Sequence, residues 1–149
     1  MGKLTDYATV VLASLAQEPA RHRAAAELAE RTRLSRPTVS KVLKGLQRAG
    51  LVISSRGVQG GYRLARPPRE ITAAQILDVF EGPIAITECS SASSQCGIER
   101  QCRVGGAWQR INAAIRRALD DVTLEQLAGL DASAGRVPGL TLDIRRAAS

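Results

Sequence analysis

All three cysteines of the chain lie within a stretch of fourteen residues, at positions Cys89, Cys96 and Cys102. The surrounding segment 88–103 is rich in serine and glutamine and has no apolar periodicity, so packing in a core does not explain its sulfurs. Three thiolates this close together can bind one soft metal centre and leave a fourth position open for a different donor. An odd number of cysteines also argues against a disulfide framework. Metal or redox chemistry is therefore the favoured interpretation.

The size and composition of the chain limit what can position these cysteines. Its 149 residues make one domain of ordinary size, and 44% apolar residues are enough for a core. Only four aromatic residues are present, which indicates an aliphatic, helical core. No apolar run approaches the roughly 18 residues of a membrane span, and the first segment lacks a signal-peptide cleavage site. We therefore expect a cytoplasmic protein with no membrane partner.

Positive charge is concentrated in the first half of the chain. The net charge is +7, and residues 1–70 carry thirteen Lys and Arg against five Asp and Glu, whereas residues 71–149 carry eight against nine. This distribution is typical of a polyanion-binding module joined to a sensing or pairing module, although a solvated basic surface would give the same totals. An enzyme is not expected, because the chain has one histidine, no phosphate-binding glycine motif and no evident nucleophile–base pair.

Residues 24–33 and 37–48 predict two short helices joined by a tight turn. Ser35 can cap the second helix, Pro37 is tolerated in its first turn, and Gly50 is a suitable stop. A pair of this kind, with apolar residues on the inner face of the second helix, is typical of a helix-turn-helix. The outer face of the second helix is basic and rich in hydroxyl groups, with Arg36, Thr38, Ser40, Lys41, Lys44 and Arg48.

A glycine-rich hairpin follows the helix-turn-helix. Residues 51–55 and 61–65 predict two strands, and the glycines between them, including Gly57, permit a tight turn and a close approach to a phosphate backbone. Such a hairpin is commonly no more than a hairpin, but in this position it predicts the wing of a winged helix. Arg56 at its tip can enter a narrow minor groove, whose negative potential favours a guanidinium group.

These features predict a role in DNA binding for each polar side chain. Thr38, Ser40 and Lys41 are expected near base edges in the major groove, and Gly57 at the turn of the wing. Phosphate contacts are expected from Lys44, Arg36 and Arg63. Two wings on a dimer predict a pseudo-palindromic operator in double-stranded DNA.

The remaining segments predict helices that surround this module. Thr5 is a candidate N-cap for a first helix that packs beneath the helix-turn-helix, and Asp6 falls in its first turn, where a carboxylate complements the helix dipole. A helix over 73–81 precedes the cysteines. A longer one over 107–122 has the apolar stripe of a dimerisation surface, although packing within one chain is the alternative. The stripe comprises Trp108, Ile111, Ile115 and Leu119, with Arg110, Arg116 and Arg117 opposite.

The fold class expected is mainly α with a small β-hairpin wing: a winged helix-turn-helix plus a long dimerisation helix. The predicted organisation comprises a DNA-binding domain (1–70), a connecting helix and loop (71–88), a cysteine loop (89–103), a dimerisation helix with a short C-terminal helix (104–130) and a loop or disordered tail (131–149).

In order along the chain, these pieces resemble the IscR/NsrR/RirA family of bacterial winged-helix regulators, which carry an iron–sulfur cluster. The resemblance covers roughly residues 3–128, and its opening and wing are most similar to the branch that regulates iron–sulfur assembly operons. The matching pieces are the opening Leu4-Thr5-Asp6-Tyr7-Ala8, Leu34-Ser35, Gly50-Leu51-Val52, Arg56-Gly57, Gly60-Gly61-Tyr62-Arg63-Leu64 and the three cysteines.

The resemblance implies a homodimeric repressor whose cluster occupancy sets DNA affinity, with the three cysteines as sulfur ligands. The fourth ligand is where the sequence departs from the pattern of IscR-like members. Members like IscR have a histidine three residues after the third cysteine, where this chain has Gly105, whereas members like NsrR use an aspartate of the partner's first helix, where this chain has Asp6. Asp6 is therefore favoured over Glu88, Glu99 and His22, and both a 2Fe–2S and a 4Fe–4S cluster remain open. Nitric oxide or redox sensing, a zinc site and a thiol switch are the alternatives.

Overall fold

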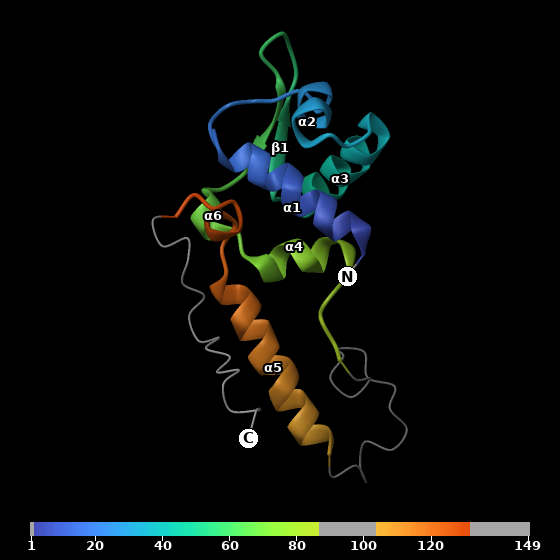
Figure 1. The fold of residues 1–149 in the computed structure, drawn as a ribbon, viewed down its shortest axis with the longest axis vertical. Coiled ribbons are helices and arrows are strands. Elements are labelled where there is room, and N and C mark those ends of the chain that lie inside the picture. The colour runs from blue at the N-terminus through green and yellow to red at the C-terminus, as the bar shows by residue number, and fades with distance from the viewer. Residues whose placement is uncertain (1, 87–103, 132–149) are drawn as a thin grey trace, which may run out of the picture.

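The computed structural model describes residues 2–86 and 104–131 (Figure 1). Several residues singled out in the sequence lie outside these ranges. They are the three cysteines Cys89, Cys96 and Cys102, the acidic residues Glu88 and Glu99, and the tail from residue 132.

The described chain is mainly helical and contains one two-stranded antiparallel sheet, which confirms the predicted fold class. In chain order the elements are α1 (Lys3–Ala16), α2 (Ala25–Thr32), α3 (Arg36–Arg48), β1 (Val52–Ser55), β2 (Gly61–Leu64), the 3-10 turn η1 (Pro68–Glu70), α4 (Ala73–Phe80), α5 (Gly105–Asp121) and α6 (Leu124–Leu127).

An aliphatic core joins the first three helices. The apolar positions of α1 that recur at helical spacing are all buried, and the inner face of α3 is fully buried. Burying a side chain of this size contributes roughly 1.5–3 kcal/mol. The inner face therefore fixes α3 in the body and leaves its polar face outward. The buried residues are Ala8, Val11, Leu12 and Leu15 from α1, Leu28 from α2, and Val39, Val42, Leu43 and Leu46 from α3.

Local signals define both ends of α3 as predicted. The Ser35 side chain accepts a hydrogen bond from the Thr38 backbone N–H at 3.3 Å, and Pro37 lies in the first turn, where its missing N–H is not needed. Gly50 follows the helix with φ +74°, a left-handed conformation that glycine adopts without a steric penalty.

The predicted capping role of Thr5 is wrong. α1 begins at Lys3 with Gly2 as its N-cap, so Thr5 lies inside the helix. Thr5 is only 3% exposed, and its hydroxyl donates to Glu81 Oε1 at 2.7 Å. The sequence pattern missed this role because the partner is 76 residues away along the chain. Asp6 does fall in the first turn of α1, as expected.

The wing is anchored by a residue from the connector between α1 and α2. β1 and β2 pair from Val52 opposite Leu64 to Ser55 opposite Gly61. Arg23 extends this sheet: its backbone N–H donates to the Tyr62 carbonyl at 2.9 Å, and its carbonyl accepts from the Tyr62 N–H at 2.8 Å. β2 is therefore tied along its outer edge to the connector between α1 and α2.

The chain after α5 returns to the N-terminal core. Leu124 of α6 is fully buried, and its N–H donates to the Ile71 carbonyl at 2.7 Å. The Ala73 N–H donates to the Val122 carbonyl at 2.8 Å, which joins the start of α4 to the end of α5. From this junction α5 extends away from the winged helix (Figure 1). Only its C-terminal end is therefore tied to the body by these backbone hydrogen bonds.

One arginine predicted on the free face of α5 contacts α4 instead. The Arg116 guanidinium donates to Asp78 Oδ1 at 2.8 Å and, from Nε, to Asp120 Oδ2 at 3.4 Å. The hydrogen bond to Asp78 is the main reason why the pKa of Arg116 is raised above its usual value. Helical spacing alone could not show this contact, because it places a residue on a face without naming the neighbour that covers that face.

Candidate nucleic-acid interface and metal centre

The outer face of α3 presents the polar residues expected to contact DNA. Arg36, Ser40, Lys41 and Lys44 are exposed, whereas Thr38 is half-buried. The Thr38 hydroxyl lies 2.7 Å from Ser35 Oγ, so it belongs to the helix cap as well as to the polar face. The other four side chains form no hydrogen bond or ion pair with the described residues. They are therefore available to an external partner.

The wing places its polar residues differently. Arg56 and Gly57 are exposed at the turn, and Gly57 has φ +111°, which suits a residue without a side chain. Arg63 is half-buried on β2, and its guanidinium donates to the Leu64 carbonyl at 3.4 Å. Arg56 is thus the more accessible of the two guanidinium groups.

Sequence reasoning missed the importance of Arg23. This arginine is 1% exposed, and its guanidinium pairs with Glu18 and, at 2.5 Å, with Glu27 Oε1. A buried charged group needs such partners, because moving it out of water without a partner destabilises the fold by several kcal/mol. Removing one partner of a buried ion pair costs about 3–5 kcal/mol. The spacing Glu18, Arg23, Glu27 was the available signal, but only the fold shows that Arg23 pairs with β2 at the edge of the wing.

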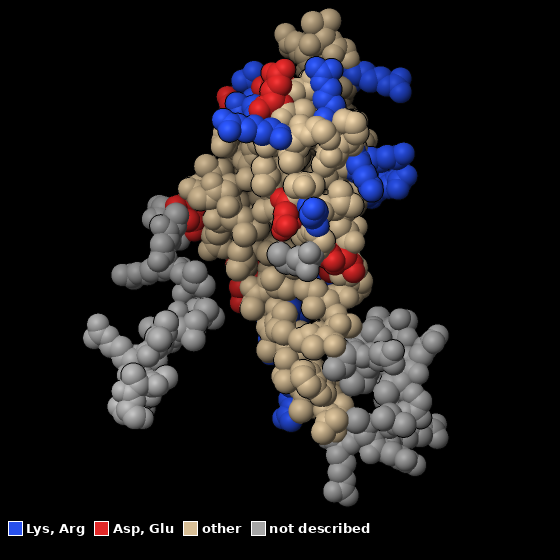
Figure 2. All heavy atoms as spheres, turned by 45° about the vertical axis from the view of Figure 1, so that its right-hand side comes forward, with Lys and Arg blue, Asp and Glu red and all other residues tan. Residues whose placement is uncertain are grey.

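Charge is distributed unevenly over the surface. Figure 2 shows Lys and Arg side chains standing out from the winged helix in the upper part of the molecule, with acidic side chains among them. The visible surface of α5, below, is mostly uncharged in the same view. The winged helix therefore presents most of the cationic groups seen in this view.

The apolar stripe on α5 is largely uncovered. Trp108 is 39% exposed and Ile111 is 44% exposed, whereas Ile115 and Leu119 are half-buried. Exposed aliphatic and aromatic groups in a row on one helix mark an interaction surface more often than isolated ones do. At its C-terminal end the stripe meets a groove.

This groove has a volume of about 440 Å³ and lies between α1, α4, α5 and α6. Asp6 lies on its wall and is exposed, and its carboxylate forms no hydrogen bond or ion pair with the described residues. The groove is otherwise mostly apolar; it is lined by Thr5, Thr9, Val10, Ala73, Ile76, Leu77, Leu119 and Leu127 as well as Asp6. A carboxylate without a partner among the described residues can act as the single oxygen ligand of a metal site whose other ligands come from another segment.

The end of α4 lies close to α1. Glu81 caps the end of α4, and its Oε1 accepts from Thr5 Oγ1 at 2.7 Å and from the Gly2 backbone N–H at 2.5 Å. The Thr5 hydroxyl and the Gly2 N–H hold the pKa of Glu81 below its usual value. The segment that leads to Cys89 therefore starts beside the first turn of α1, where Asp6 lies.

The other candidate ligands do not share this position. His22 is half-buried beyond the C-terminal end of α1, and ten residues of helix separate Asp6 from that end, about 15 Å. Among residues 2–86 and 104–131, no three His, Cys, Asp or Glu side chains gather as a metal site. Glu88 and Glu99 lie outside these ranges with the cysteines. No helix in the described ranges is both long and apolar enough to cross a membrane.

Comparison with known proteins decides the family. Residues 1–129 match the model of the Rrf2 family, described as iron-dependent transcriptional regulators. The chain belongs to the Rrf2 family. This confirms the resemblance inferred from the sequence and makes the protein a transcriptional regulator rather than an enzyme.

Three Rrf2-family relatives show how far the similarity extends. The regulator CymR of Bacillus subtilis is 38% identical over 101 residues, covering 68% of each chain. Its solved structure, titled as that of the global cysteine regulator, has a TM-score of 0.68 and covers 88% of this chain and 97% of its own. The IscR structure from T. potens is 28% identical, with a TM-score of 0.66 and 93% coverage of both chains. NsrR of Shouchella clausii is 29% identical over 126 residues, covering 83% of this chain and 84% of its own.

Proposed function

We propose that this Rrf2-family regulator is a homodimeric cytosolic repressor of iron–sulfur cluster assembly genes, whose DNA affinity depends on a bound iron–sulfur cluster. Cys89, Cys96 and Cys102 would supply the sulfur ligands and Asp6 the fourth. The observation that carries this proposal is the exposed Asp6 carboxylate, which forms no hydrogen bond or ion pair with the described residues and lies near the end of α4, from which the chain leads to the cysteines. The family description as iron-dependent regulators supports the same chemistry.

The donor set fits an iron–sulfur cluster. Three thiolates with one oxygen donor leave one iron with a weaker ligand, and such a cluster when bound supplies a centre sensitive to redox state and competing ligands. Residues of this chain would connect the cluster to the DNA-binding face. Asp6 lies in the first turn of α1, and α1 packs through Val11 and Leu15 in the same core as the inner face of α3. Ligation of Asp6 would therefore involve a helix that shares the core of the recognition helix.

DNA contacts follow from the exposed polar face of α3 and from the wing. Ser40 and Lys41, with Thr38 at the cap, would approach base edges in the major groove, and Arg56 and Gly57 would approach the minor groove. Arg36, Lys44 and Arg63 would hold phosphates; the half-buried Arg63 is the least accessible of them. With two winged helices in a dimer, the operator would be pseudo-palindromic.

The first test is anaerobic visible absorption with iron and sulfide analysis of the purified protein. We expect charge-transfer bands with matching iron and sulfide, and a changed spectrum or lower iron content in Asp6→Ala. Glu30→Ala is the control, because it removes an exposed carboxylate from α2 and should leave the spectrum unchanged. The iron content per chain would also separate a 2Fe–2S from a 4Fe–4S cluster. An Asp6→Ala variant with wild-type spectrum and iron content would reject Asp6 as ligand.

A mixed dimer tests which subunit supplies Asp6. The end of α4 lies beside α1 of the same chain, whereas the resemblance implies an aspartate from the partner. We would pair one chain carrying Asp6→Ala with one carrying Cys96→Ala. If Asp6 acts across the dimer, one of the two sites stays intact and half of the wild-type cluster content remains. If it acts within its own chain, both sites are damaged.

A thiol switch is the second candidate, favoured by one comparison. One solved structure of Staphylococcus aureus CymR, which is 30% identical to this chain with a TM-score of 0.60, is of an oxidized form. In that case the cysteines would respond to oxidant without iron, and purified protein would be colourless. A zinc site would likewise be colourless but would bind zinc stoichiometrically. Nitric oxide sensing, by contrast, requires the cluster and would appear as bleaching of its bands.

A further inference from the structure

The short helix α4 contacts three functionally distinct parts of the molecule. Phe80 lies against α3, Glu81 accepts hydrogen bonds from the first residues of α1, and Asp78 pairs with Arg116 of α5. These three residues lie within the four positions 78–81, just before the segment that leads to Cys89. The winged helix and the dimerisation helix are thus both attached to the end of α4.

The contact between α4 and the recognition helix depends on the absence of a side chain. A Cβ atom built on Gly45 would lie 2.9 Å from Cε1 and 3.1 Å from Cζ of Phe80. Such distances are shorter than carbon–carbon van der Waals contact, which is optimal near about 3.5–4.0 Å. Gly45 is a glycine inside a helix, where this residue costs roughly 0.5–1 kcal/mol relative to alanine. The close approach of the Phe80 ring gives a physical reason why glycine occupies position 45.

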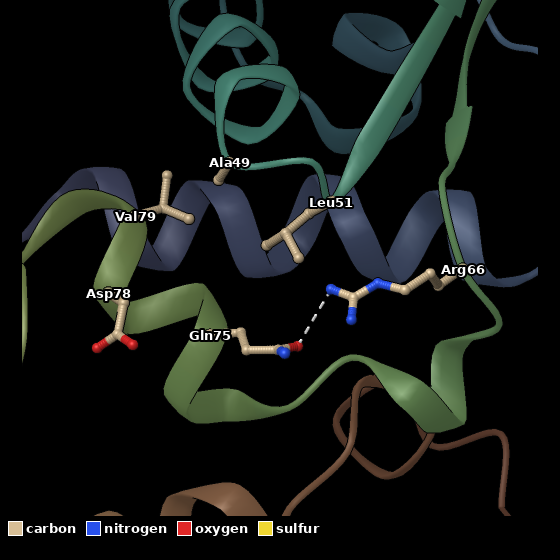
Figure 3. Close-up of a pocket in the computed structure, with 6 residues that line it drawn as sticks. All are labelled: Ala49, Leu51, Arg66, Gln75, Asp78 and Val79. Atoms are coloured by element: carbon tan, nitrogen blue, oxygen red, sulfur yellow. Dashed lines mark hydrogen bonds between the residues drawn. The ribbon is translucent and has the colours of Figure 1, made fainter.

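Next to this contact the two elements are not closely packed. A cavity of about 250 Å³ separates Ala49 and Leu51, at the end of α3 and the start of β1, from Gln75, Asp78 and Val79 of α4 (Figure 3). Arg66 closes another side and donates to Gln75 Oε1 at 3.4 Å, a long hydrogen bond. Val79, the residue before Phe80, lines this cavity, so α4 borders open space next to its contact with α3.

We propose that Phe80 is a positioning residue, which transmits a displacement of α4 to the recognition helix through its contact with Gly45. The inference rests on the proposed function, because the displacement would come from the cysteine segment that follows α4. Glu81 and Asp78 link the end of α4 to α1 and α5, and the ring of Phe80 is the group by which α4 itself approaches α3 at Gly45. Packing interfaces with two arrangements, rather than continuous deformation, are the usual means of such transmission.

The test uses two variants with opposite changes in volume and their combination. Gly45→Ala inserts a methyl group against the ring, Phe80→Leu removes the ring edge that the methyl group meets, and the double variant restores the fit. Ile76→Val is the control, since it weakens α4 at a buried position that does not meet Gly45 in this way. Each full-length protein is prepared with the cluster and after anaerobic removal by a chelator.

The measured quantity is the ratio of DNA affinities with and without the cluster, on an operator selected from random duplexes by the loaded wild-type protein. We expect Gly45→Ala and Phe80→Leu to lower this ratio about threefold or more, and the double variant to recover part of it. Ile76→Val should keep the wild-type ratio. The salt dependence of binding to non-specific duplex DNA should not change, because the phosphate contacts on the outer face of α3 remain. Amide hydrogen exchange of α3 should differ between loaded and unloaded wild type, and this difference should shrink in Phe80→Leu.

The other outcomes separate failure of the inference from failure of the proposed function. Wild-type ratios in both single variants would overturn the role of Phe80 and leave cluster sensing intact. A loss in Ile76→Val as large as in Phe80→Leu would also overturn it, because general loosening would then suffice. A wild-type protein that binds DNA equally with and without the cluster would overturn both. If Gly45→Ala does not fold, Phe80→Leu and the double variant still decide the question.

Discussion

At the scale of single residues, Gly61 shows how the wing is fixed to the body. It has φ +139°, and a Cβ atom at this position would lie 2.6 Å from the backbone carbon and oxygen of Arg23. We predict that Gly61→Ala lowers the free energy of unfolding by roughly 2–4 kcal/mol, from backbone strain and loss of the Arg23–Tyr62 hydrogen bonds. Chemical denaturation followed by circular dichroism measures this change.

The matched control for Gly61 is Gly57. Its φ is also positive, at +111°, but a Cβ atom there would meet nothing within 4 Å. Gly57→Ala should therefore cost only the conformational strain, about 1–2 kcal/mol. Equal losses in the two variants would contradict the claim that the close approach of Arg23 matters.

Arg56 provides the corresponding prediction for DNA binding. Its exposed guanidinium at the turn of the wing is expected in the minor groove, so Arg56→Ala should weaken binding and reduce the preference for A·T-rich flanks. The slope of log affinity against log salt concentration should fall by about 1, since one cationic contact is lost. Fluorescence anisotropy titrations at several salt concentrations, on both flank types, measure both effects.

Arg69→Ala is the control for this experiment. Arg69 is exposed on η1, which packs against α6 rather than beside the wing, so the variant removes the same charge from a different place. It should leave flank preference unchanged. Identical titration curves for Arg56→Ala and wild type on both flank types would exclude a minor-groove role for Arg56.

At the scale of elements, the sequence predicted those features that depend on neighbours in the chain. The Ser35 cap and the stop at Gly50 are both local, and both are present. The features that the sequence missed involve distant partners. Thr5 bonds to Glu81, Arg23 pairs with Tyr62 of β2, and Arg116 pairs with Asp78. Periodicity gives the face on which a residue lies, but the element that covers this face follows only from the tertiary fold.

Glu81 joins α4 to α1 and makes this junction sensitive to pH. The Thr5 hydroxyl and the Gly2 N–H lower the pKa of Glu81 in the folded state below its unfolded value of about 4.5. The ionised carboxylate therefore contributes stability above the unfolded pKa, and this contribution is lost as the pH falls through the lower folded pKa. We predict that Glu81→Gln reduces the difference in unfolding midpoint between about pH 6, above the unfolded pKa, and about pH 3, below it.

Glu70→Gln serves as the comparison for Glu81→Gln. Glu70 is exposed on η1, and its carboxylate forms no hydrogen bond or ion pair with the described residues. Its replacement should leave the pH dependence as in the wild type. A wild-type pH profile in Glu81→Gln would show that the two hydrogen bonds from α1 do not act on this carboxylate in solution.

At the scale of the whole molecule, two surfaces of different chemistry are separated in space. The winged helix carries most of the positive charge of the chain, and α5 extends from it with an uncovered apolar stripe (Figures 1 and 2). DNA neutralises the first surface, and burial against another apolar surface stabilises the second. A twofold dimer through α5 would satisfy the second requirement and would present two winged helices to one duplex.

This arrangement predicts that a charge on the stripe separates the subunits. Ile111 is 44% exposed and lies at its centre, between Trp108 and Ile115. Ile111→Glu should shift the protein to monomers in sedimentation velocity, because a buried unpaired carboxylate is strongly unfavourable. Ala113→Glu adds the same group on the opposite face of α5, two residues away by a rotation of about 200°, and should remain dimeric.

Since a monomer presents only one winged helix, Ile111→Glu should also lose high affinity for a palindromic duplex and keep binding to a single half-site. A dimeric Ile111→Glu protein would place the subunit contact elsewhere and assign the stripe to packing within one chain.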